Sequence, residues 1–386
     1  MKLLCVVSAL DIQYRYGCTA AWWQFLKGLW ELGHDVIAIP YQGAAFESPW
    51  WRAYPNPCRV EGDAFAQVKK FMGGGATSTQ GGVSAAVTKR LIDSWIRPRW
   101  ESQLVDIVGQ ERDIDAVIVF GVPLNHFTGI ASRLRSKYGT RMFYFDGDVP
   151  ASLPRFQGFA SGFRIYEGAD LSEYTGFMCN SQGGCAELLQ MGARSAQAVH
   201  WGADPSLYEP IECEQDRDVF FYGIGAEYRE TWIDALLTRP SLKLTEVTFA
   251  AGGGGFPAEL GRVRMLGYVP FNRLRHECWR SRINLSISRR THAELFATST
   301  VRPFELAAMG CCIVGNPHSG IETWFEPDKE IILVGTAEEA IEAYECLLAD
   351  PARRKAMGEA ARRRILECHT HRHRAADIVR CVLAAD

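Results

Sequence analysis

The sequence predicts an α/β protein of two domains, each built on a parallel sheet. Three observations carry this prediction. Short apolar runs alternate with amphipathic stretches, the alternation restarts near the middle of the chain, and 386 residues are long for one domain but suit two. We place the domains at residues 1–203 and 204–370, divided beside the polar stretch ADPSLYEP. Residues 371–386 are expected to form a C-terminal helix that packs back on the first domain.

Composition excludes several classes of function. The net charge is −3, so no general attraction to nucleic acid or to anionic lipid is expected. The first apolar run, MKLLCVVSAL, is too short to span a membrane and Asp11 ends it. The 12 cysteines lack metal-ligand or disulfide-framework spacing and several lie in apolar runs, as expected of buried thiols in a cytoplasmic protein.

The first domain opens as a strand–helix–strand unit. Leu3–Ala9 is an apolar run typical of a buried parallel strand. Thr19–Leu32 carries aromatic and aliphatic residues at helical spacing, and Val36–Ile39 is the second strand. The first turn lacks G-x-G-x-x-G, which argues against a nicotinamide or flavin cofactor there. Later elements of this domain are expected at Val83–Val108 (helix), Ala116–Phe120, Met142–Phe145 and Gly176–Asn180 (strands), and Ser181–Met191 (helix).

A glycine-rich segment, Gly73–Gly82, interrupts the first domain with the sequence GGGATSTQGG. Glycines at this density predict a break in regular structure. Two interpretations stay open: a mobile lid over an acceptor, or a simple linker between helices.

Polar residues follow two strands of the first domain. His126 comes after Ala116–Phe120, and Asp146 and Asp148 come at the end of Met142–Phe145. Because ligands of open α/β sheets bind beyond the carboxyl ends of the strands, we select these three as catalytic candidates. Each is able to act as a general base for a substrate hydroxyl. The alternative for each is a loop residue that caps the next helix.

The second domain repeats the alternation of strands and helices. Its strands are expected at Asp218–Tyr222, Leu244–Ala250, Asn284–Ser288, Cys311–Val314 and Ile331–Val334, and its helices at Glu227–Leu237, Phe271–Arg280, Arg302–Met309 and Ala337–Leu348. Gly223 and Gly225 predict a tight turn after the first of these strands, with Arg229 at the start of the next helix. A strand, a glycine turn and a helix N-terminus together form a possible phosphate cradle.

A stronger phosphate signal lies at the start of the helix Arg302–Met309. Ser299 and Thr300 precede this helix, so their hydroxyls are able to cap its free N–H groups. Arg302 adds a forked cation beside the positive end of the helix, which suits a phosphate. Glu305 lies on the same face and is able to accept hydrogen bonds from ribose hydroxyls. The alternative is a helix on which Arg302 and Glu305 only pair with each other.

Two basic segments near the C-terminus are assigned no ligand. The helix that begins at Asp350 is rich in arginine, which predicts a solvated face. The run HTHRHR, residues 369–374, lacks an acidic or cysteine ligand, and its arginines repel a cation. We therefore expect a polar helix link here and no metal site.

Four segments of the second half carry a family resemblance: FYGIGAEYRE, GYVPFNRLRHECWRSRINLSIS, STVRPFELAAMGCCIVGNPHSG and LLADPARRKAMGEAARRRILECHT. This half resembles the donor domain of GT-B glycosyltransferases, closest to the CgeB-like, family-one-type branch that is similar to the retaining family 4 enzymes. The first half resembles them in outline. In that family two Rossmann-like domains face each other across a cleft, with the nucleotide-sugar on the C-terminal domain and the acceptor on the N-terminal one. Glu305 aligns with the second acid of the family's E-x7-E pattern, and the first falls at Ala297.

The resemblance implies a glycosyltransferase that moves a sugar from a nucleotide-diphosphate sugar to a hydroxyl of a small molecule or glycan. It implies retention of configuration, and the arginines imply that no metal is needed, because Arg229 and Arg302 are able to neutralise the leaving diphosphate. Two other functions stay open. A nucleotide-sugar epimerase of this fold would need carboxylates, for which Glu294 and Glu322 are candidates. A non-catalytic sugar-binding or coat-associated protein is the third possibility.

Overall fold

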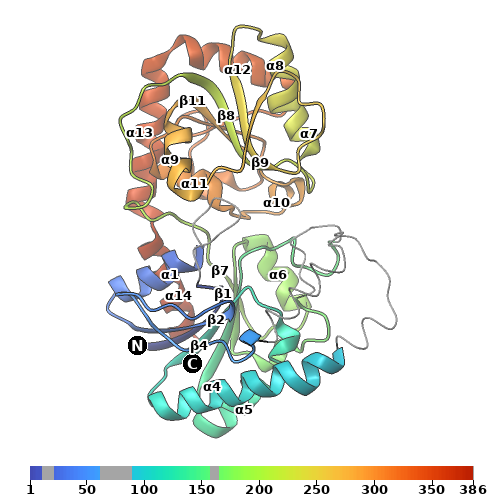
Figure 1. The fold of residues 1–386 in the computed structure, drawn as a ribbon, viewed down its shortest axis with the longest axis vertical. Coiled ribbons are helices and arrows are strands. Elements are labelled where there is room, and N and C mark those ends of the chain that lie inside the picture. Colours follow the sequence, from blue (N-terminus) through green and yellow to red (C-terminus); the bar gives the residue numbers. More distant parts are fainter. Residues whose placement is uncertain (11–20, 61–88, 157–164, 386) are drawn as a thin grey trace.

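The computed structural model describes residues 1–10, 21–60, 89–156 and 165–385, and it consists of two lobes stacked end to end (Figure 1). Each lobe holds one sheet, and every pair of neighbouring strands in both sheets is parallel. This confirms the predicted α/β class with two parallel sheets. The glycine-rich segment Gly73–Gly82 lies outside the described residues, so both interpretations of it stay predictions.

The N-terminal lobe contains a seven-stranded sheet with the order β3-β2-β1-β4-β5-β6-β7. Its strands are β1 (Lys2–Ala9), β2 (Asp35–Gln42), β3 (Arg52–Ala53), β4 (Ala116–Phe120), β5 (Arg141–Asp146), β6 (Gly176–Cys179) and β7 (Ala196–Ala198). Its helices are α1 (Ala21–Glu31), α4 (Arg97–Glu111), α5 (Ile130–Tyr138) and α6 (Gln182–Gln190), with a π-helical turn η1 (Ile92–Ile96) and 3₁₀ turns η2 (Leu124–His126) and η3 (Leu171–Glu173).

The C-terminal lobe contains a six-stranded sheet with the order β10-β9-β8-β11-β12-β13. Its strands are β8 (Arg217–Ile224), β9 (Phe249–Gly254), β10 (Arg264–Gly267), β11 (Ser281–Ser286), β12 (Ile313–Gly315) and β13 (Ile332–Leu333). The helices after β8 are α7 (Glu230–Ile233), η4 (Asp234–Thr238), α8 (Arg239–Lys243), α9 (Phe271–Trp279), α10 (Arg290–Glu294), α11 (Val301–Ala308), η5 (Ile321–Thr323), α12 (Ala337–Ala349), α13 (Pro351–Cys368) and α14 (His371–Leu383).

Side chains of β1 alternate between two hydrophobic cores because successive residues of a strand face opposite sides of the sheet. Leu3 and Val7 join the core that includes α1 and α14, whereas Leu4 and Val6 join the core that includes α4 and α5. The first of these cores continues into the C-terminal lobe, where Phe304 of α11 belongs to it. Buried apolar surface therefore connects the two lobes as well as filling each.

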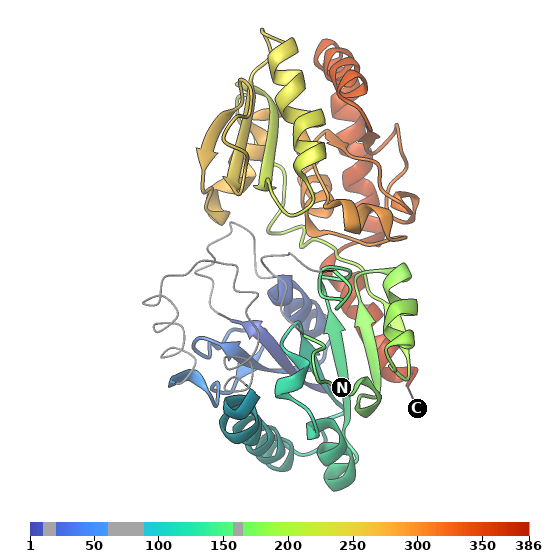
Figure 2. The same ribbon diagram turned by 90° about the vertical axis from the view of Figure 1, so that its right-hand side faces the viewer.

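The last helix returns to the first lobe. The chain leaves the C-terminal lobe through α13, and α14 then lies against α1, so both termini are found in the same lobe (Figures 1 and 2). The two helices approach closely at Gly28, where an added Cβ would lie 2.8 Å from the carbonyl oxygen of His371. Glycine is required there because any side chain would separate the helices. The His371 ring also pairs with Glu31 at 2.8 Å.

Three short strands, β3, β7 and β10, are absent from the sequence prediction, and β9 is displaced from its predicted position. The predicted strand Leu244–Ala250 is wrong as far as Thr248, because Leu244 and Val247 close turns after α8 and the strand begins at Phe249. The strand instead extends into glycines, where Gly252 and Gly253 pair with the end of β8. Pairing with a central strand outweighs the poor intrinsic strand preference of glycine.

The arginine-rich helix α13 is less solvated than predicted. Arg362 donates to the carbonyl oxygen of Ala308 at the end of α11, and Arg364 pairs with Glu330 at 3.2 Å. These contacts hold α13 against the C-terminal lobe. Within the described ranges, no helix combines the length and apolar character needed to cross a membrane.

Candidate active site

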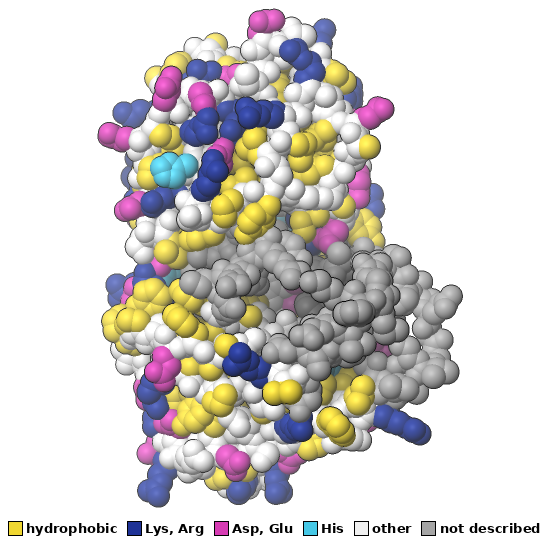
Figure 3. Space-filling view, viewed as in Figure 1, with side chains coloured by type: hydrophobic (Ala, Val, Ile, Leu, Met, Phe, Trp, Pro, Cys, Tyr) yellow, Lys and Arg dark blue, Asp and Glu magenta, His cyan; other side chains and the backbone are white. Residues whose placement is uncertain are grey.

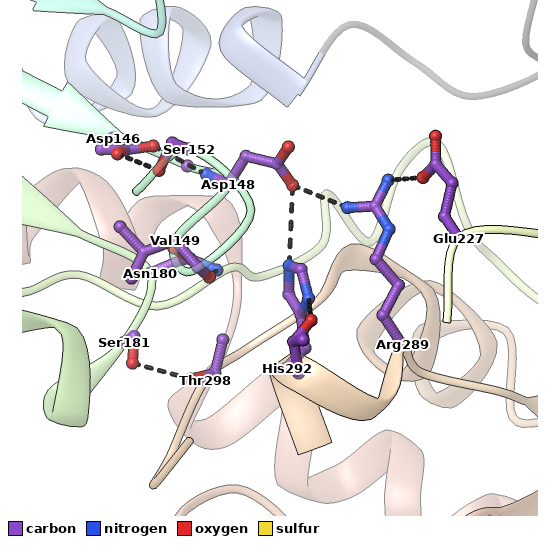
Figure 4. A network of polar contacts seen from close by, with 12 residues as sticks. Asp146, Asp148, Val149, Ser152, Asn180, Ser181, Glu227, Arg289, His292 and Thr298 are labelled. Carbon is purple, nitrogen blue, oxygen red and sulfur yellow. Dashed lines mark hydrogen bonds and ion pairs between the residues drawn. The ribbon is translucent and has the colours of Figure 1, made fainter. Parts of the chain in front are cut away.

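A network of charged side chains joins the two lobes beyond the carboxyl ends of β5 and β11 (Figure 4). Asp148, from the N-terminal lobe, accepts a hydrogen bond of 3.0 Å from Nη1 of Arg289 in the C-terminal lobe. Nε2 of His292 lies 3.6 Å from the same carboxylate oxygen. The other guanidinium nitrogen of Arg289 pairs with Glu227. One predicted candidate, Asp148, therefore belongs to a site built from both halves of the chain.

The loop that carries Asp148 is fixed by two indole rings beneath it. A Cβ at Gly147 would lie 2.5 Å from the Trp201 ring and 3.2 Å from that of Trp22. Trp201 also donates a hydrogen bond of 3.2 Å from Nε1 to the carbonyl oxygen of Gly147. Because only glycine lets the backbone lie this close to the rings, the loop sits flat on them and presents Asp148 to the other lobe.

Asp146 has a different position from the one predicted for a catalytic base. Its carboxylate is buried and accepts hydrogen bonds from the hydroxyls of Ser152 and Tyr166 and from the backbone N–H of Asp148. Burial raises the pKa of Asp146, and the three hydrogen bonds oppose that shift. With its oxygens engaged in this way, the side chain holds the Asp148 loop in place and does not face the other lobe.

The predicted tight turn at Gly223 and Gly225 is wrong. Strand β8 continues through Ile224, and the N–H of Gly225 donates to the carbonyl oxygen of Gly254 at 2.9 Å. The turn instead lies at Glu227 and Tyr228, whose φ angles are 63° and 65°. Left-handed backbone at two successive non-glycine residues is unusual and tends to occur at functional sites. Here it brings the carboxylate of Glu227 to Arg289.

Arg229 and Arg289 form a pair of neighbouring cations. Nε of Arg229 donates to the carbonyl oxygen of Ile287 at 3.0 Å, which fixes the guanidinium beside the end of β11. Burial and the charge of Arg289 lower the pKa of Arg229 to about 10. Two guanidinium groups this close repel each other, and the carboxylates of Glu227 and Asp148 offset that repulsion. An anion with more than one negative charge that took the place of Asp148 on Arg289 would meet both guanidinium groups.

The charge state of Asp148 follows from its partners. Burial alone would raise the pKa of this carboxyl, but the contacts with His292 and Arg289 outweigh burial and hold the pKa below its usual value. Burial lowers the pKa of His292 despite the adjacent carboxylate. At neutral pH the site thus holds an ionised Asp148 beside a neutral imidazole.

The predicted cap of α11 is used to join the lobes. Ser299 is fully buried, and its hydroxyl accepts the N–H of Trp201 at 2.9 Å and donates to the carbonyl oxygen of Asn180 at 3.0 Å. The N–H of Ser299 also donates to the Asn180 carbonyl at 2.8 Å, and Ser181 bonds Thr298 at 2.7 Å. Ser299 is therefore committed to the N-terminal lobe rather than open to a phosphate. We call these contacts of Asn180 and Ser181 with Thr298 and Ser299 the interlobe clip.

Thr300 takes the N-cap position of α11, but its side chain makes no capping hydrogen bond. The capping role predicted for this hydroxyl is therefore wrong. Thr300 instead lines a small cavity with Ser288, Asn316 and His318 at the carboxyl ends of β11 and β12. Burial lowers the pKa of His318 to about 4, so this ring is neutral at physiological pH.

Arg302 and Glu305 pair with each other, which is the alternative that the sequence offered to phosphate and ribose binding. Their side chains approach to 2.7 Å, and the hydroxyl of Tyr208 donates to the other side of the Glu305 carboxylate at 2.5 Å. Glu305 is 0% exposed. The Arg302 guanidinium lies over the Tyr222 ring, 5.2 Å from its centre. The carboxylate predicted to bind ribose is thus closed off by Tyr208 in this arrangement.

His126 forms a separate polar pair. It lies after β4, and its Nδ1 is 2.5 Å from the hydroxyl of Tyr41, which lies near the end of β2. Burial and the charge of Arg97 lower the pKa of His126 to about 4. A neutral imidazole hydrogen-bonded to a phenol is able to orient a hydroxyl group, and its low basicity argues against a strong general base.

Sequence reasoning missed Arg289, His292 and Glu227. A usable signal was present, since the polar run SRRTHAE directly follows strand β11. The rule that ligands bind beyond the carboxyl ends of strands selected Asp146 and Asp148, and it applies equally to this run. In contrast, Glu294 is 68% exposed and pairs with Arg290 of the same helix, α10. It therefore lacks the buried position expected of a catalytic carboxylate in an epimerase.

Aromatic side chains gather at the edge of the N-terminal lobe. Trp23 stacks on Phe46 with ring centres 5.9 Å apart, and Trp50 meets Trp23 edge-on. On the face shown in Figure 3, hydrophobic side chains are grouped on the left of this lobe, over α1 and the stretch that follows β2. No group of three or more metal-ligating side chains occurs among the residues that the structure describes.

Comparisons with known proteins agree with this architecture. Residues 229–380 match a family model described as glycosyl transferase-like. A search of curated proteins finds no match to the chain. Among solved structures, the chain resembles sucrose-phosphate synthase from Thermosynechococcus elongatus at 14% identity and a TM-score of 0.66, with 100% of both chains covered.

Two further solved structures resemble the chain over its whole length. HepE from Anabaena, solved in complex with UDP-glucose, has 12% identity and a TM-score of 0.61, with 100% of both chains covered. AviGT4, a glycosyltransferase involved in avilamycin A biosynthesis, has 15% identity and a TM-score of 0.60, with 100% of this chain and 98% of that chain covered. Residues 229–380 match a glycosyl transferase-like domain, and the chain as a whole has the GT-B fold of these solved structures.

Proposed function

We propose that this protein transfers a sugar from a nucleotide-diphosphate sugar to an acceptor hydroxyl, with retention of configuration and without a metal ion. The observation that carries the proposal is the meeting of Asp148 from one lobe with Arg289 and His292 from the other. A cationic pair on the donor side thus faces a carboxylate on the acceptor side, at the carboxyl ends of both sheets. Transfer reactions need both substrates in one such place.

The diphosphate of the donor lies against Arg229 and Arg289 in this proposal. As the bond to the sugar breaks, negative charge develops on the leaving diphosphate, and fixed cations stabilise that charge. Two guanidiniums supply what a divalent metal supplies elsewhere, so no metal is required. Arg229 keeps one of its own N–H groups on the Ile287 carbonyl and is held in position before the donor arrives.

Asp148 serves the acceptor and the developing sugar cation. Its low pKa makes it a weak base but an ionised group at neutral pH, so its charge stabilises a positively charged anomeric centre. His292 positions the carboxylate, and His126 with Tyr41 is available to orient an acceptor hydroxyl. A strong general base is not obligatory when configuration is retained.

UDP-glucose is the first donor to test, because HepE, which shares this fold, was solved in complex with it. The experiment measures UDP release from UDP-glucose in the presence of a panel of sugar and glycan acceptors, with and without EDTA. We expect acceptor-dependent release that EDTA does not reduce, and an α-configured product by the anomeric proton coupling in NMR. Loss of activity in EDTA would overturn metal independence, and a β-configured product would overturn retention.

Other nucleotide sugars follow in the same assay if UDP-glucose is not turned over. Conversion of the donor to an isomer without an acceptor would instead identify an epimerase. Absence of binding and turnover with UDP, GDP, dTDP, ADP and CDP sugars would contradict the proposed function as a whole.

A further inference from the structure

A second polar pocket lies away from the Asp148 site, where three parts of the chain meet. Its walls include His200 after β7, Trp324 after η5, and His369, Arg374 and Arg380 around α14. The pocket therefore draws on the N-terminal lobe, the C-terminal lobe and the returning helix. Its volume is about 320 Å³, which lies at the small end of the range of roughly 300–1,000 Å³ for small-molecule sites.

Positive charge exceeds negative charge in this pocket. Arg374 pairs with Asp377 at 2.7 Å, and Arg380 pairs with the same carboxylate, so two cations share one anion. Arg374 is only 6% exposed. Asp377 therefore balances only one of the two guanidinium groups, which leaves a net positive charge at this wall of the pocket.

Two neutral histidines also line the pocket, and Nδ1 of one of them, His200, donates to the carbonyl oxygen of Asn180 at 3.3 Å. Burial and the charge of Arg374 lower the pKa of His200 to about 4 and that of His369 to about 3. Arg374 donates to Nδ1 of His369, so the proton of this neutral ring lies on Nε2 and is available as a donor. His200 packs edge-on against Trp324 with ring centres 5.0 Å apart, which fixes its position.

We propose that this pocket binds a small phosphate-bearing anion at a site separate from that of the nucleotide-sugar. Forked guanidinium groups and ring N–H donors are the groups that recognise phosphate oxygens in proteins. The volume accommodates a phosphate with a small organic group attached. Because the walls come from both lobes and from α14, an anion bound there favours the arrangement of lobes seen in this structure.

The test is calorimetric titration of the full chain with inorganic phosphate and then with glycerol phosphate. The probe variant is Arg380→Gln, which removes one cation of the pocket from a side chain that is 74% exposed, so that folding is preserved. The matched control is Arg372→Gln on the same helix, whose side chain is 57% exposed and faces Glu31. We expect roughly tenfold weaker binding in Arg380→Gln, as is typical for a lost charge-assisted hydrogen bond, and wild-type binding in Arg372→Gln.

A third variant, Arg289→Gln, separates this pocket from the proposed donor site. We expect it to bind both probes as the wild type does. Loss of binding in Arg289→Gln with retention in Arg380→Gln would assign the anion to the donor site and overturn the proposal. Equal binding in Arg380→Gln and wild type would also overturn the proposal. So would the absence of binding of either probe at a concentration of about 10 millimolar.

Discussion

The carboxylate of Asp148 and the guanidinium of Arg289 lie 3.0 Å apart and join the two lobes of the protein. Arg289 is only 10% exposed and also pairs with Glu227, so a carboxylate from each lobe holds it. A donor diphosphate that binds Arg289 competes with Asp148 for it. Binding of the donor is therefore expected to release Asp148 toward the acceptor, so that donor binding precedes catalysis.

Replacing Asp148 by asparagine tests the catalytic role of this carboxylate. Asp148→Asn keeps the shape of the side chain but removes its charge, so we expect kcat to fall about a hundredfold, as for other losses of electrostatic stabilisation. Because the side chain is 40% exposed and Arg289 keeps its pair with Glu227, the melting temperature should change little. The measurement is steady-state kinetics beside thermal unfolding. Asp106→Asn, an exposed change on α4, is the control, and a kcat in Asp148→Asn equal to that control would remove Asp148 from the reaction.

The role of Glu305 is tested by separating its stability contribution from its binding contribution. Glu305→Ala removes the carboxylate that pairs with Arg302, whose side chain is 18% exposed, and breaking a mostly buried ion pair typically costs about 3–5 kcal/mol of stability. If Glu305 also binds ribose, donor affinity falls with it. Tyr208→Phe removes only the hydroxyl that contacts Glu305, so it should cost about 1 kcal/mol of stability and leave UDP affinity intact.

A conservative variant completes that test. Glu305→Gln keeps the size of the side chain and much of its hydrogen bonding, so the fold should persist. We expect UDP to bind this variant as it binds wild type, by calorimetry, because Arg302 and Tyr208 engage both oxygens of the carboxylate. At least tenfold weaker binding would show that Glu305 contacts the donor ribose and would contradict this structural role.

The interlobe clip should contribute to stability. Ser299→Ala removes a buried hydroxyl that serves the N–H of Trp201 and the carbonyl of Asn180. The carbonyl of Asn180 keeps the N–H of residue 299, but the N–H of Trp201 loses its acceptor. Leaving that N–H unpaired typically costs about 1–3 kcal/mol, which urea denaturation measures. The control, Ser136→Ala, lies on the exposed side of α5 and should stay within about 0.5 kcal/mol of wild type. Equal unfolding free energies in the two variants would contradict the clip.

Stability should decline in mild acid because several histidines are buried in neutral form. Burial lowers the pKa of His126, His200 and His318 to about 4, from an ordinary value of 6.5. Between these values the unfolded chain binds more protons than the folded one, so unfolding becomes easier as pH falls from about 6.5 to about 4. Thermal unfolding from pH 7.5 to 4.5 measures this. His126→Asn should flatten the decline, and an unchanged slope in that variant would contradict the buried neutral state of His126.

The sequence was informative where the chain obeys local rules. Apolar runs located Ala116–Phe120 without error, and the rule for strand ends then selected Asp148. The sequence was uninformative about the partners of Asp148, because Asp148 and Arg289 are 141 positions apart and meet only when the lobes come together. No periodicity within either segment encodes that contact.

Local rules also failed where a distant segment competes for the same group. The hydroxyl of Ser299 has the position of a helix cap, yet Trp201 and Asn180 bind it instead. Glycine was expected to mark the turn after β8, but the turn lies at Glu227, where the ion pair with Arg289 accompanies the left-handed backbone. In both cases tertiary contacts outweigh the local preference, as happens most often at functional sites.

The proposed donor site holds a diphosphate between Arg229 and Arg289, and UDP affinity in Arg289→Gln tests this site most directly. Calorimetry in EDTA compares this variant with Arg290→Gln, whose side chain is adjacent in sequence, 59% exposed and paired with Glu294. We predict at least tenfold weaker binding in Arg289→Gln and wild-type binding in Arg290→Gln. Equal affinity in wild type and Arg289→Gln, or binding that disappears when EDTA is added to wild type, would contradict the metal-free site.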